Sequence, residues 1–168
     1  ALVELVNLHD PALSFEPIHR VVFAAGGLTD ALTAALDPTH TPMADLDALL
    51  TAVQDGDGSG FGVITADGYT LVEPRRPTHQ LAVGTLQSFL DAWLADHPDA
   101  EIDYLHGEDI TDELGRRLGN VSFILPGIAK GSFFRSIAAD GPLPRKTFSM
   151  GHARDKRFYL ECRRITES

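Results

Sequence analysis

Cysteine and long hydrophobic runs are scarce in this sequence of 168 residues. The single cysteine, Cys162, has no partner for an internal disulfide, which predicts a protein of a reducing compartment such as the cytoplasm. No apolar run reaches the roughly 18 residues that a membrane-spanning helix needs, so we expect no membrane partner. Hydrophobic residues nevertheless make up 43% of the chain, enough to build the core of a globular domain.

Basic residues are also few, with 14 lysines and arginines against 24 aspartates and glutamates, for a formal net charge of −10. This balance argues against a general nucleic-acid partner, which requires a basic surface to neutralise phosphates. The charge is uneven: residues 1–120 hold 5 basic and 20 acidic residues, while residues 121–168 hold 9 and 4. The basic C-terminal segment either lines a site for an anion or neutralises the acidic part across a packed interface.

No motif in the sequence indicates a particular reaction. There is no glycine-rich phosphate-binding loop, no legible Ser-His-Asp order and no pair of cysteines or histidines at the spacing of a metal site, so we expect no metal. The stretch DGDGSG at residues 55–60 resembles the first half of a calcium-binding loop, but Ala66 occupies the position where the loop requires glutamate. The alternating stretch after it predicts a β-hairpin, so we interpret DGDGSG as a turn.

Hydrophobic periodicity predicts an α+β fold, a mixed β-sheet packed against about four to five helices. Helical spacing of apolar residues occurs in segments 28–37, 42–54, 79–97, 109–119 and 130–140. Short apolar or alternating runs predict strands at 1–8, 19–24, 61–73, 101–107, 121–126, 145–151 and 155–165. Thr78 is a candidate N-cap for the helix in 79–97. Without a linker or repeat, residues 1–168 are expected to form a single α+β domain.

The first candidate site lies beside Pro17, whose ring restricts the backbone before a strand. His19 supplies an imidazole that can act as acid or base, and Arg20 supplies a guanidinium that can hold an anion. We therefore predict a catalytic role for His19 and a ligand-binding role for Arg20. The alternative is that Arg20 only pairs with a nearby acid such as Glu16 and that His19 is a hydrogen-bonded edge residue.

The second candidate site is GPLPRKTFSMG at residues 141–151. Arg145, Lys146 and the hydroxyl of Ser149 form a cationic, donor-rich entry to a strand, which suits a phosphate or a carboxylate. These three residues are predicted to bind a cofactor or substrate anion. The alternative is an ordinary exposed basic turn.

The third candidate is His106, at the end of the predicted strand 101–107 and before a glycine. A histidine in this position can face a pocket at the edge of a sheet and serve as a second catalytic acid or base. Its neighbours Glu108 and Asp109 have the simpler interpretation of favouring the start of the next helix.

Two stretches of the sequence resemble the C-terminal half of a conserved prokaryotic family catalogued as domain of unknown function 1015: ALVELVNLHDPALSFEPIHRVV and VSFILPGIAKGSFFRSIAADGPLPRKTFSMG. The motifs that carry the resemblance are PIHR at residues 17–20 and GPLPRKT at residues 141–147. The resemblance covers nearly the whole chain, although both motifs are short. FSMG stands where typical members have a tyrosine-rich strand and a second lysine, which implies a branch with a different ligand.

The resemblance implies that residues 1–168 are the C-terminal part of a longer bacterial protein, and the start at Ala1 inside an apolar run fits that expectation. The family has an upstream Asp-Gly-x-His segment, similar to the nucleotide-binding core of ParB-like proteins and free-serine kinases. This sequence has no such segment. The expected partner is therefore the N-terminal half of the same protein, together with a small anionic ligand, and no cofactor is specified.

Two functions remain open from the sequence. The chain is either part of a phosphate- or nucleotide-using small-molecule enzyme, or a non-catalytic structural or interaction domain that packs against the N-terminal half. The enzyme hypothesis requires the basic and imidazole side chains named above to meet in one cleft. The structural hypothesis predicts that they pair with one another.

Overall fold

Residue 5, residues 7–11 and residues 13–151 are described by the structure, a computed structural model of the chain. Five helices and eight strands lie in this range: β1 (Phe15–Pro17), β2 (His19–Phe23), α1 (Leu28–Leu36), β3 (Thr39–Met43), α2 (Leu46–Asp55), β4 (Phe61–Thr65), β5 (Gly68–Glu73), α3 (Ala82–Ala95), β6 (Glu101–Leu105), α4 (Glu108–Gly115), β7 (Val121–Ile124), α5 (Lys130–Asp140) and β8 (Phe148–Met150). Strands β2 to β7 form a six-stranded sheet in the order β3-β5-β4-β7-β2-β6, and β1 pairs with β8 in a separate two-stranded sheet. Every pairing between these strands is antiparallel.

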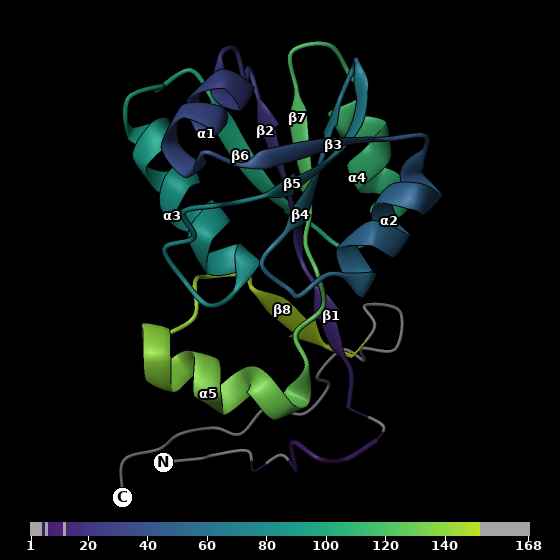
Figure 1. The fold of residues 1–168 in the computed structure, drawn as a ribbon, viewed down its shortest axis with the longest axis vertical. Coiled ribbons are helices and arrows are strands. Elements are labelled where there is room, and N and C mark those ends of the chain that lie inside the picture. The colour runs from purple at the N-terminus through teal and green to yellow at the C-terminus, as the bar shows by residue number, and fades with distance from the viewer. Residues whose placement is uncertain (1–4, 6, 12, 152–168) are drawn as a thin grey trace, which may run out of the picture.

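Helices cover both faces of the six-stranded sheet, with α1 and α3 on one side and α2 and α4 on the other (Figure 1). Side chains alternate between the two faces along each strand. On β2, Val22 packs into the core beneath α1 and α3, and Arg20, two residues earlier, points to the same side. His19 and Val21 therefore face the side of α2 and α4.

The larger core lies between the sheet and the pair α1 and α3. Leu28, Leu32 and Leu36 recur at helical spacing on α1 and are almost fully buried. On the longer α3, Leu86 and Leu90 are completely buried against the sheet. The apolar stripes read from the sequence are thus the faces that anchor these helices.

The second core, between the sheet and α2, is smaller, and α4 approaches this face of the sheet through a glycine. Gly115 packs directly over β7, and a Cβ atom built on it would lie 2.7 Å from both Cβ and Oγ of Ser122 and 3.2 Å from Cβ of Ile64. Ordinary van der Waals contact requires about 3.5–4.0 Å between carbon atoms. The helix can lie this close only because residue 115 has no side chain.

Gly115→Ala is expected to destabilise the protein by about 1–3 kcal/mol through overpacking, outweighing the gain of at most about 1 kcal/mol in helix propensity. Gly131→Ala is the matched control, because it also lies in a helix and its Cβ would meet no atom within 4 Å. Urea unfolding of the two variants should therefore shift in opposite directions. Equal shifts would show that the contact with Ser122 relaxes without cost.

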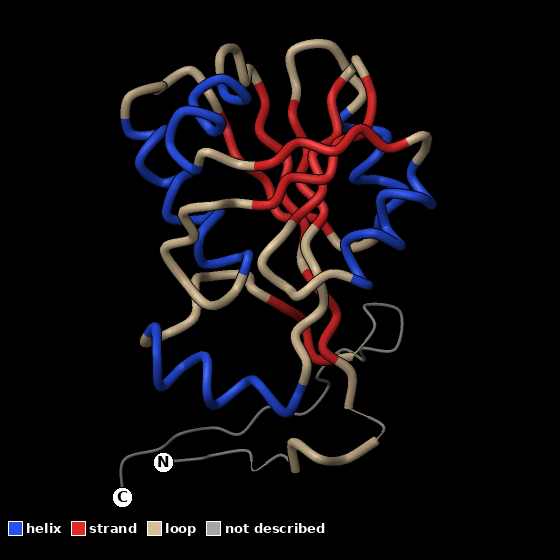
Figure 2. Tube along the Cα trace, viewed as in Figure 1, coloured by secondary structure: helices blue, strands red, loops and turns tan. Residues whose placement is uncertain are grey.

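A smaller unit lies at one end of the sheet, formed by β1, α5, β8 and the loop between α5 and β8 (Figures 1 and 2). We call this unit, residues 15–17 and 130–150, the arm. Its interior is aromatic: the rings of Phe15, Phe133 and Phe148 lie within 4.4–5.7 Å of one another, centroid to centroid. The arm thus has its own packing and is continuous with the main sheet where β1 passes into β2.

The predicted α+β class and helix number are confirmed. The sheet differs from the prediction, because pairing among the described strands is antiparallel rather than mixed. Strand β3 was not predicted, since it contains Pro42 and is largely exposed; it is formed by pairing with β5 at the edge of the sheet. Thr78 does not cap α3, which begins after Leu81.

Other predictions lie wholly or partly outside the described residues. The expected strand at 155–165 and Cys162 fall beyond residue 151, and most of the expected strand at 1–8 is likewise outside. Among the helices that the structure describes, none is both long enough and apolar enough to cross a bilayer.

Candidate ligand-binding site

A cavity of about 630 Å³ lies where the arm meets the six-stranded sheet. Its wall is built from the end of β1 and the start of β2, the end of α2 and the turn after it, the starts of α3 and α4, the end of β7, the loop that follows β7, and α5. In Figure 1 this places it above α5 and between α5 and the lower ends of α2 and α3. The volume falls within the range of about 300–1,000 Å³ that is usual for small-molecule sites.

His19 reaches the cavity from the start of β2 and is only 1% exposed. The backbone N–H of Leu125 donates a hydrogen bond of 3.1 Å to its Nδ1 atom. A nitrogen that accepts a hydrogen bond carries no proton, so the neutral ring holds its proton on Nε2. Nε2 lies 3.8 Å from Oε1 of Glu108, an ion-pair distance that is too long for a hydrogen bond.

Glu108 is the first residue of α4 and lines the same cavity. Its interaction with the His19 side chain lowers the pKa of Glu108 to about 2, against the opposing effect of partial burial. The carboxylate also lies at the positive end of the helix dipole, which favours its ionised form. His19 and Glu108 together therefore present a buried N–H donor and a carboxylate acceptor at one wall of the cavity.

Acid is expected to remove the stabilisation that the Glu108 carboxylate contributes. Because its folded-state pKa is below the ordinary value of 4.5, this contribution is complete above about pH 4.5 and is lost as the pH falls towards about 2. Glu108→Gln cannot ionise, so its free energy of unfolding should fall less steeply with acid than that of the wild type. The difference should be modest, since the side chain is 44% exposed.

Urea titrations at a series of pH values measure this slope. Glu113→Gln is the control, because Glu113 lies on the same helix but pairs with Arg117 at the surface. Parallel pH profiles for the wild type and Glu108→Gln would contradict the predicted coupling with His19.

The N-termini of three helices bring partial positive charges to the wall of the cavity. Helices α3, α4 and α5 all begin at its wall, and none of the three has a side-chain N-cap. Their first N–H groups are thus left without side-chain acceptors, and each helix start carries a partial positive charge. The starts of α3 and α5 thus favour a negatively charged ligand group, whereas the partial charge at the start of α4 is already met by the carboxylate of Glu108.

Among the described residues that line the cavity, Arg135 on α5 is the only arginine or lysine. Its side chain forms no hydrogen bond or ion pair with any other residue that the structure describes. Acidic side chains are also present, but Asp57 is engaged by both the backbone N–H and the hydroxyl of Ser59, at 2.8 and 2.6 Å. The guanidinium of Arg135 is therefore available to an anion in the cavity that His19 and Glu108 also line.

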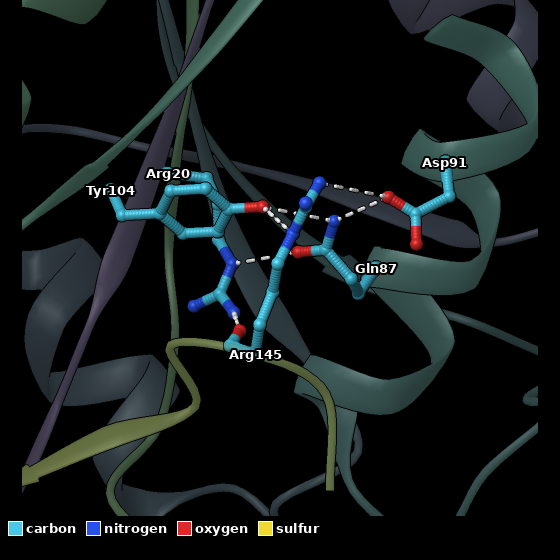
Figure 3. A network of polar contacts seen from close by, with 5 residues as sticks. All are labelled: Arg20, Gln87, Asp91, Tyr104 and Arg145. Atoms are coloured by element: carbon cyan, nitrogen blue, oxygen red, sulfur yellow. Dashed lines mark hydrogen bonds and ion pairs between the residues drawn. The ribbon is translucent and has the colours of Figure 1, made fainter. Parts of the chain in front are cut away.

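Of the six residues predicted from the sequence as site residues, only His19 lines the cavity. Arg20 follows it directly on an extended strand, so its side chain points to the opposite face of the sheet. There Arg20 lies at the centre of a polar network with Gln87, Asp91, Tyr104 and Arg145 (Figure 3). The structure thus brings Arg20 and Arg145 together but separates both of them from His19.

Arg20 is 0% exposed, and its guanidinium donates to Oε1 of Gln87 at 3.3 Å and to the backbone carbonyls of Ile18 and Arg145, the latter at 3.4 Å. It also lies 5.3 Å from the centroid of the Tyr104 ring. Burial lowers the pKa of Arg20 to about 10, so the side chain remains a cation at neutral pH. Its hydrogen-bonding capacity is thus used inside the protein.

Arg145 binds the outer side of the same network. Its Nε donates to the hydroxyl of Tyr104 at 2.9 Å, and its NH2 group lies 3.8 Å from Oδ1 of Asp91. Oδ1 of Asp91 also accepts from the amide of Gln87 at 2.8 Å. The two arginines are therefore compensated by one carboxylate, one aromatic ring and backbone carbonyls.

The remaining predicted residues lie outside the cavity wall. Lys146 is exposed and has a left-handed backbone with φ of 55°, Ser149 is buried in β8 opposite Glu16, and His106 is exposed in the turn between β6 and α4. Their predicted roles stay predictions.

Sequence reasoning gave Arg135 no role and interpreted Glu108 only as a helix-start residue. The sequence feature that could have pointed to Glu108 is its position directly after Gly107, at the turn from a strand to a helix. Arg135 offered no signal of its own, because only the packing of α5 beneath the sheet brings it to the cavity.

A family model described as "Protein of unknown function (DUF1015)" matches residues 1–93, more than half of the chain. No curated protein matched the sequence at a significant level.

Two solved structures have a similar fold, each at 11% sequence identity. A conserved hypothetical protein from Pyrococcus furiosus matches over 88% of this chain and 60% of its own, with a TM-score of 0.58. A free serine kinase, solved as a point mutant in complex with AMP, matches over 87% of this chain and 57% of its own, with a TM-score of 0.62. The chain thus spans less than two thirds of either structure, and the likeness concerns the fold.

Proposed function

The chain belongs to the DUF1015 family of proteins of unknown function, and we propose that its cavity binds a small phosphate-bearing molecule as part of a phosphate- or nucleotide-using enzyme. The observation that carries this proposal is that the starts of α3 and α5, which lack a side-chain cap, meet at one cavity with the guanidinium of Arg135, which pairs with no other described residue. Backbone N–H groups and guanidinium forks are the donors that hold phosphate oxygens in proteins.

His19 and Glu108 supply the chemistry in this proposal. The Glu108 carboxylate, which its low pKa keeps ionised, accepts a hydrogen bond from a substrate hydroxyl or ammonium group and so orients it, and the Nε2–H of His19 donates to an oxygen of the bound ligand. The hydrogen bond from Leu125 holds the ring in the orientation and tautomer that this requires. His106, Lys146 and Ser149 have no part in the proposal, because none of them lines the cavity.

The similarity to a kinase solved with AMP supports nucleotides as the first ligands to test. Because the chain spans only 57–60% of the similar structures, the complete reaction is proposed to involve the N-terminal half of the protein as well. We propose that this enzyme acts in the cytoplasm of a bacterium.

Isothermal titration calorimetry with inorganic phosphate, AMP, ADP and ATP tests the proposal on the chain itself, since the described residues form the cavity by themselves. Adenosine is the control ligand, because it carries the base and sugar but no phosphate. At least one phosphate compound should bind, and AMP should bind more tightly than adenosine. Absence of heat for all four, or equal affinity for AMP and adenosine, would refute the proposal.

A non-catalytic role is the second candidate, supported by the network in which Arg20 and Arg145 pair inside the protein rather than with a ligand. In that case the domain packs against the N-terminal half and the cavity has no ligand. Full-length protein would then bind none of the phosphate compounds either, whereas an enzyme should bind them at least as well as the isolated chain.

A further inference from the structure

Arg20 joins the arm to the rest of the protein. Its guanidinium reaches the carbonyl of Ile18, at the joint between β1 and β2, and the carbonyl of Arg145, in the loop before β8. On the other side it reaches Gln87 on α3 and the ring of Tyr104 on β6. One buried side chain thus connects four segments, two belonging to the arm or its joint and two belonging to the main body.

The contacts of Arg20 are unusual for a buried arginine whose only role is to stabilise the fold. A fully buried arginine normally requires a directly paired carboxylate, because an uncompensated charge in the protein interior is costly. Arg20 donates to an amide oxygen and to two backbone carbonyls, whereas the acid in the network, Asp91, bonds Gln87 and lies beside Arg145. Instead, the hydrogen bonds of the planar guanidinium fix the positions of three acceptor oxygens from separate segments relative to one another.

The other links between arm and body each join only two segments, as does the 2.9 Å hydrogen bond from Nε of Arg145 to the Tyr104 hydroxyl. The N–H of Ile18 donates to the carbonyl of Thr147 at 3.4 Å, and the N–H of Gln80 donates to the exposed carboxylate of Asp140 at 2.6 Å. The ion pair between Arg145 and Asp91 is exposed and 3.8 Å long. Exposed pairs of this kind contribute roughly 0–1 kcal/mol each. The link through Arg20 differs in that one completely buried side chain reaches four segments at once.

The two sides of the cavity depend on this joint. Glu16 and Arg135 belong to the arm, whereas His19, Glu108 and the start of α3 belong to the main body. A small rotation at Ile18 would move Arg135 relative to His19, although neither residue touches the network. We propose that Arg20 is a positioning residue that holds the arm against the six-stranded sheet and so sets the width of the cavity.

Hydrogen exchange measured by mass spectrometry tests this proposal without any ligand. In Arg20→Lys, which keeps the charge but loses the planar fork, amides of α5 and β8 should exchange at least ~10-fold faster, while those of β4 and β5 stay unchanged. Arg76→Lys is the matched control, since Arg76 makes a single exposed ion pair with Asp37 and should leave both regions unchanged. Faster exchange throughout the protein, or none in the arm, would overturn the proposal.

A second variant covers the case in which Arg20→Lys does not fold. Gln87→Met keeps the approximate length of the side chain but removes the amide oxygen that accepts from Nε of Arg20 at 3.3 Å. It should accelerate exchange in the arm alone, by a smaller factor, and unchanged exchange there would count against the proposal.

Ligand affinity gives a further readout that rests on the proposed function. If the wild type binds a phosphate compound, both variants should bind it more weakly with no change at the residues that contact it. If the wild type binds none, the proposed function fails, while the exchange experiment still decides the role of Arg20.

Discussion

Replacing Phe123 with alanine is expected to lower the free energy of unfolding by about 3–5 kcal/mol, the range observed when a buried aromatic ring is deleted. Phe123 is 0% exposed and lies on β7, which pairs with β4 on one side and β2 on the other. Its ring meets that of Phe61 at 6.1 Å in an edge-on arrangement. Because β7 is paired with one strand on each side, the neighbouring residues have little freedom to move into the space that the ring leaves.

Urea unfolding followed by circular dichroism measures this loss, and Phe134→Ala supplies the control. The Phe134 side chain undergoes the same chemical change but is 68% exposed, so its variant should stay within about 0.5 kcal/mol of the wild type. Similar losses for the two variants would mean that Phe123 is not at the centre of the core.

Arg135→Gln is expected to weaken the binding of the tightest phosphate compound by about 10- to 100-fold, which corresponds to one hydrogen bond to a charged group of roughly 1.5–3 kcal/mol. Glutamine keeps most of the side-chain length but loses the charge and the two-pronged donor. The side chain makes no other contact of this kind among the described residues, so the fold should be unaffected.

Arg117→Gln is the control for the change in net charge. Arg117 lies near the end of α4 and forms a surface ion pair with Glu113, away from the cavity wall. Its variant should bind the compound as the wild type does. Equal weakening in both variants would show that the protein attracts phosphate only through its overall charge, and Arg135 would then have no specific role.

The sequence singled out PIHR and GPLPRKT as unusual stretches, but it did not predict how the two motifs contact each other. The two motifs do meet, through the N–H of Ile18 on the carbonyl of Thr147 and through Arg20 on the carbonyl of Arg145. The contact is made by backbone groups and one buried guanidinium rather than by side chains gathered round a ligand. Local sequence patterns report which residues are unusual, whereas the direction of each side chain depends on strand register.

The sequence by itself determined the α+β class, the five helices and the central strands, because these follow from the local spacing of apolar residues along the chain. Tertiary structure alone decided the site. It turned His19 and Arg20 to opposite faces of one strand, and it placed Glu108 and Arg135, which lie far along the chain, at the cavity that His19 lines. Such contacts depend on how whole elements pack, and no local pattern of residues encodes that packing.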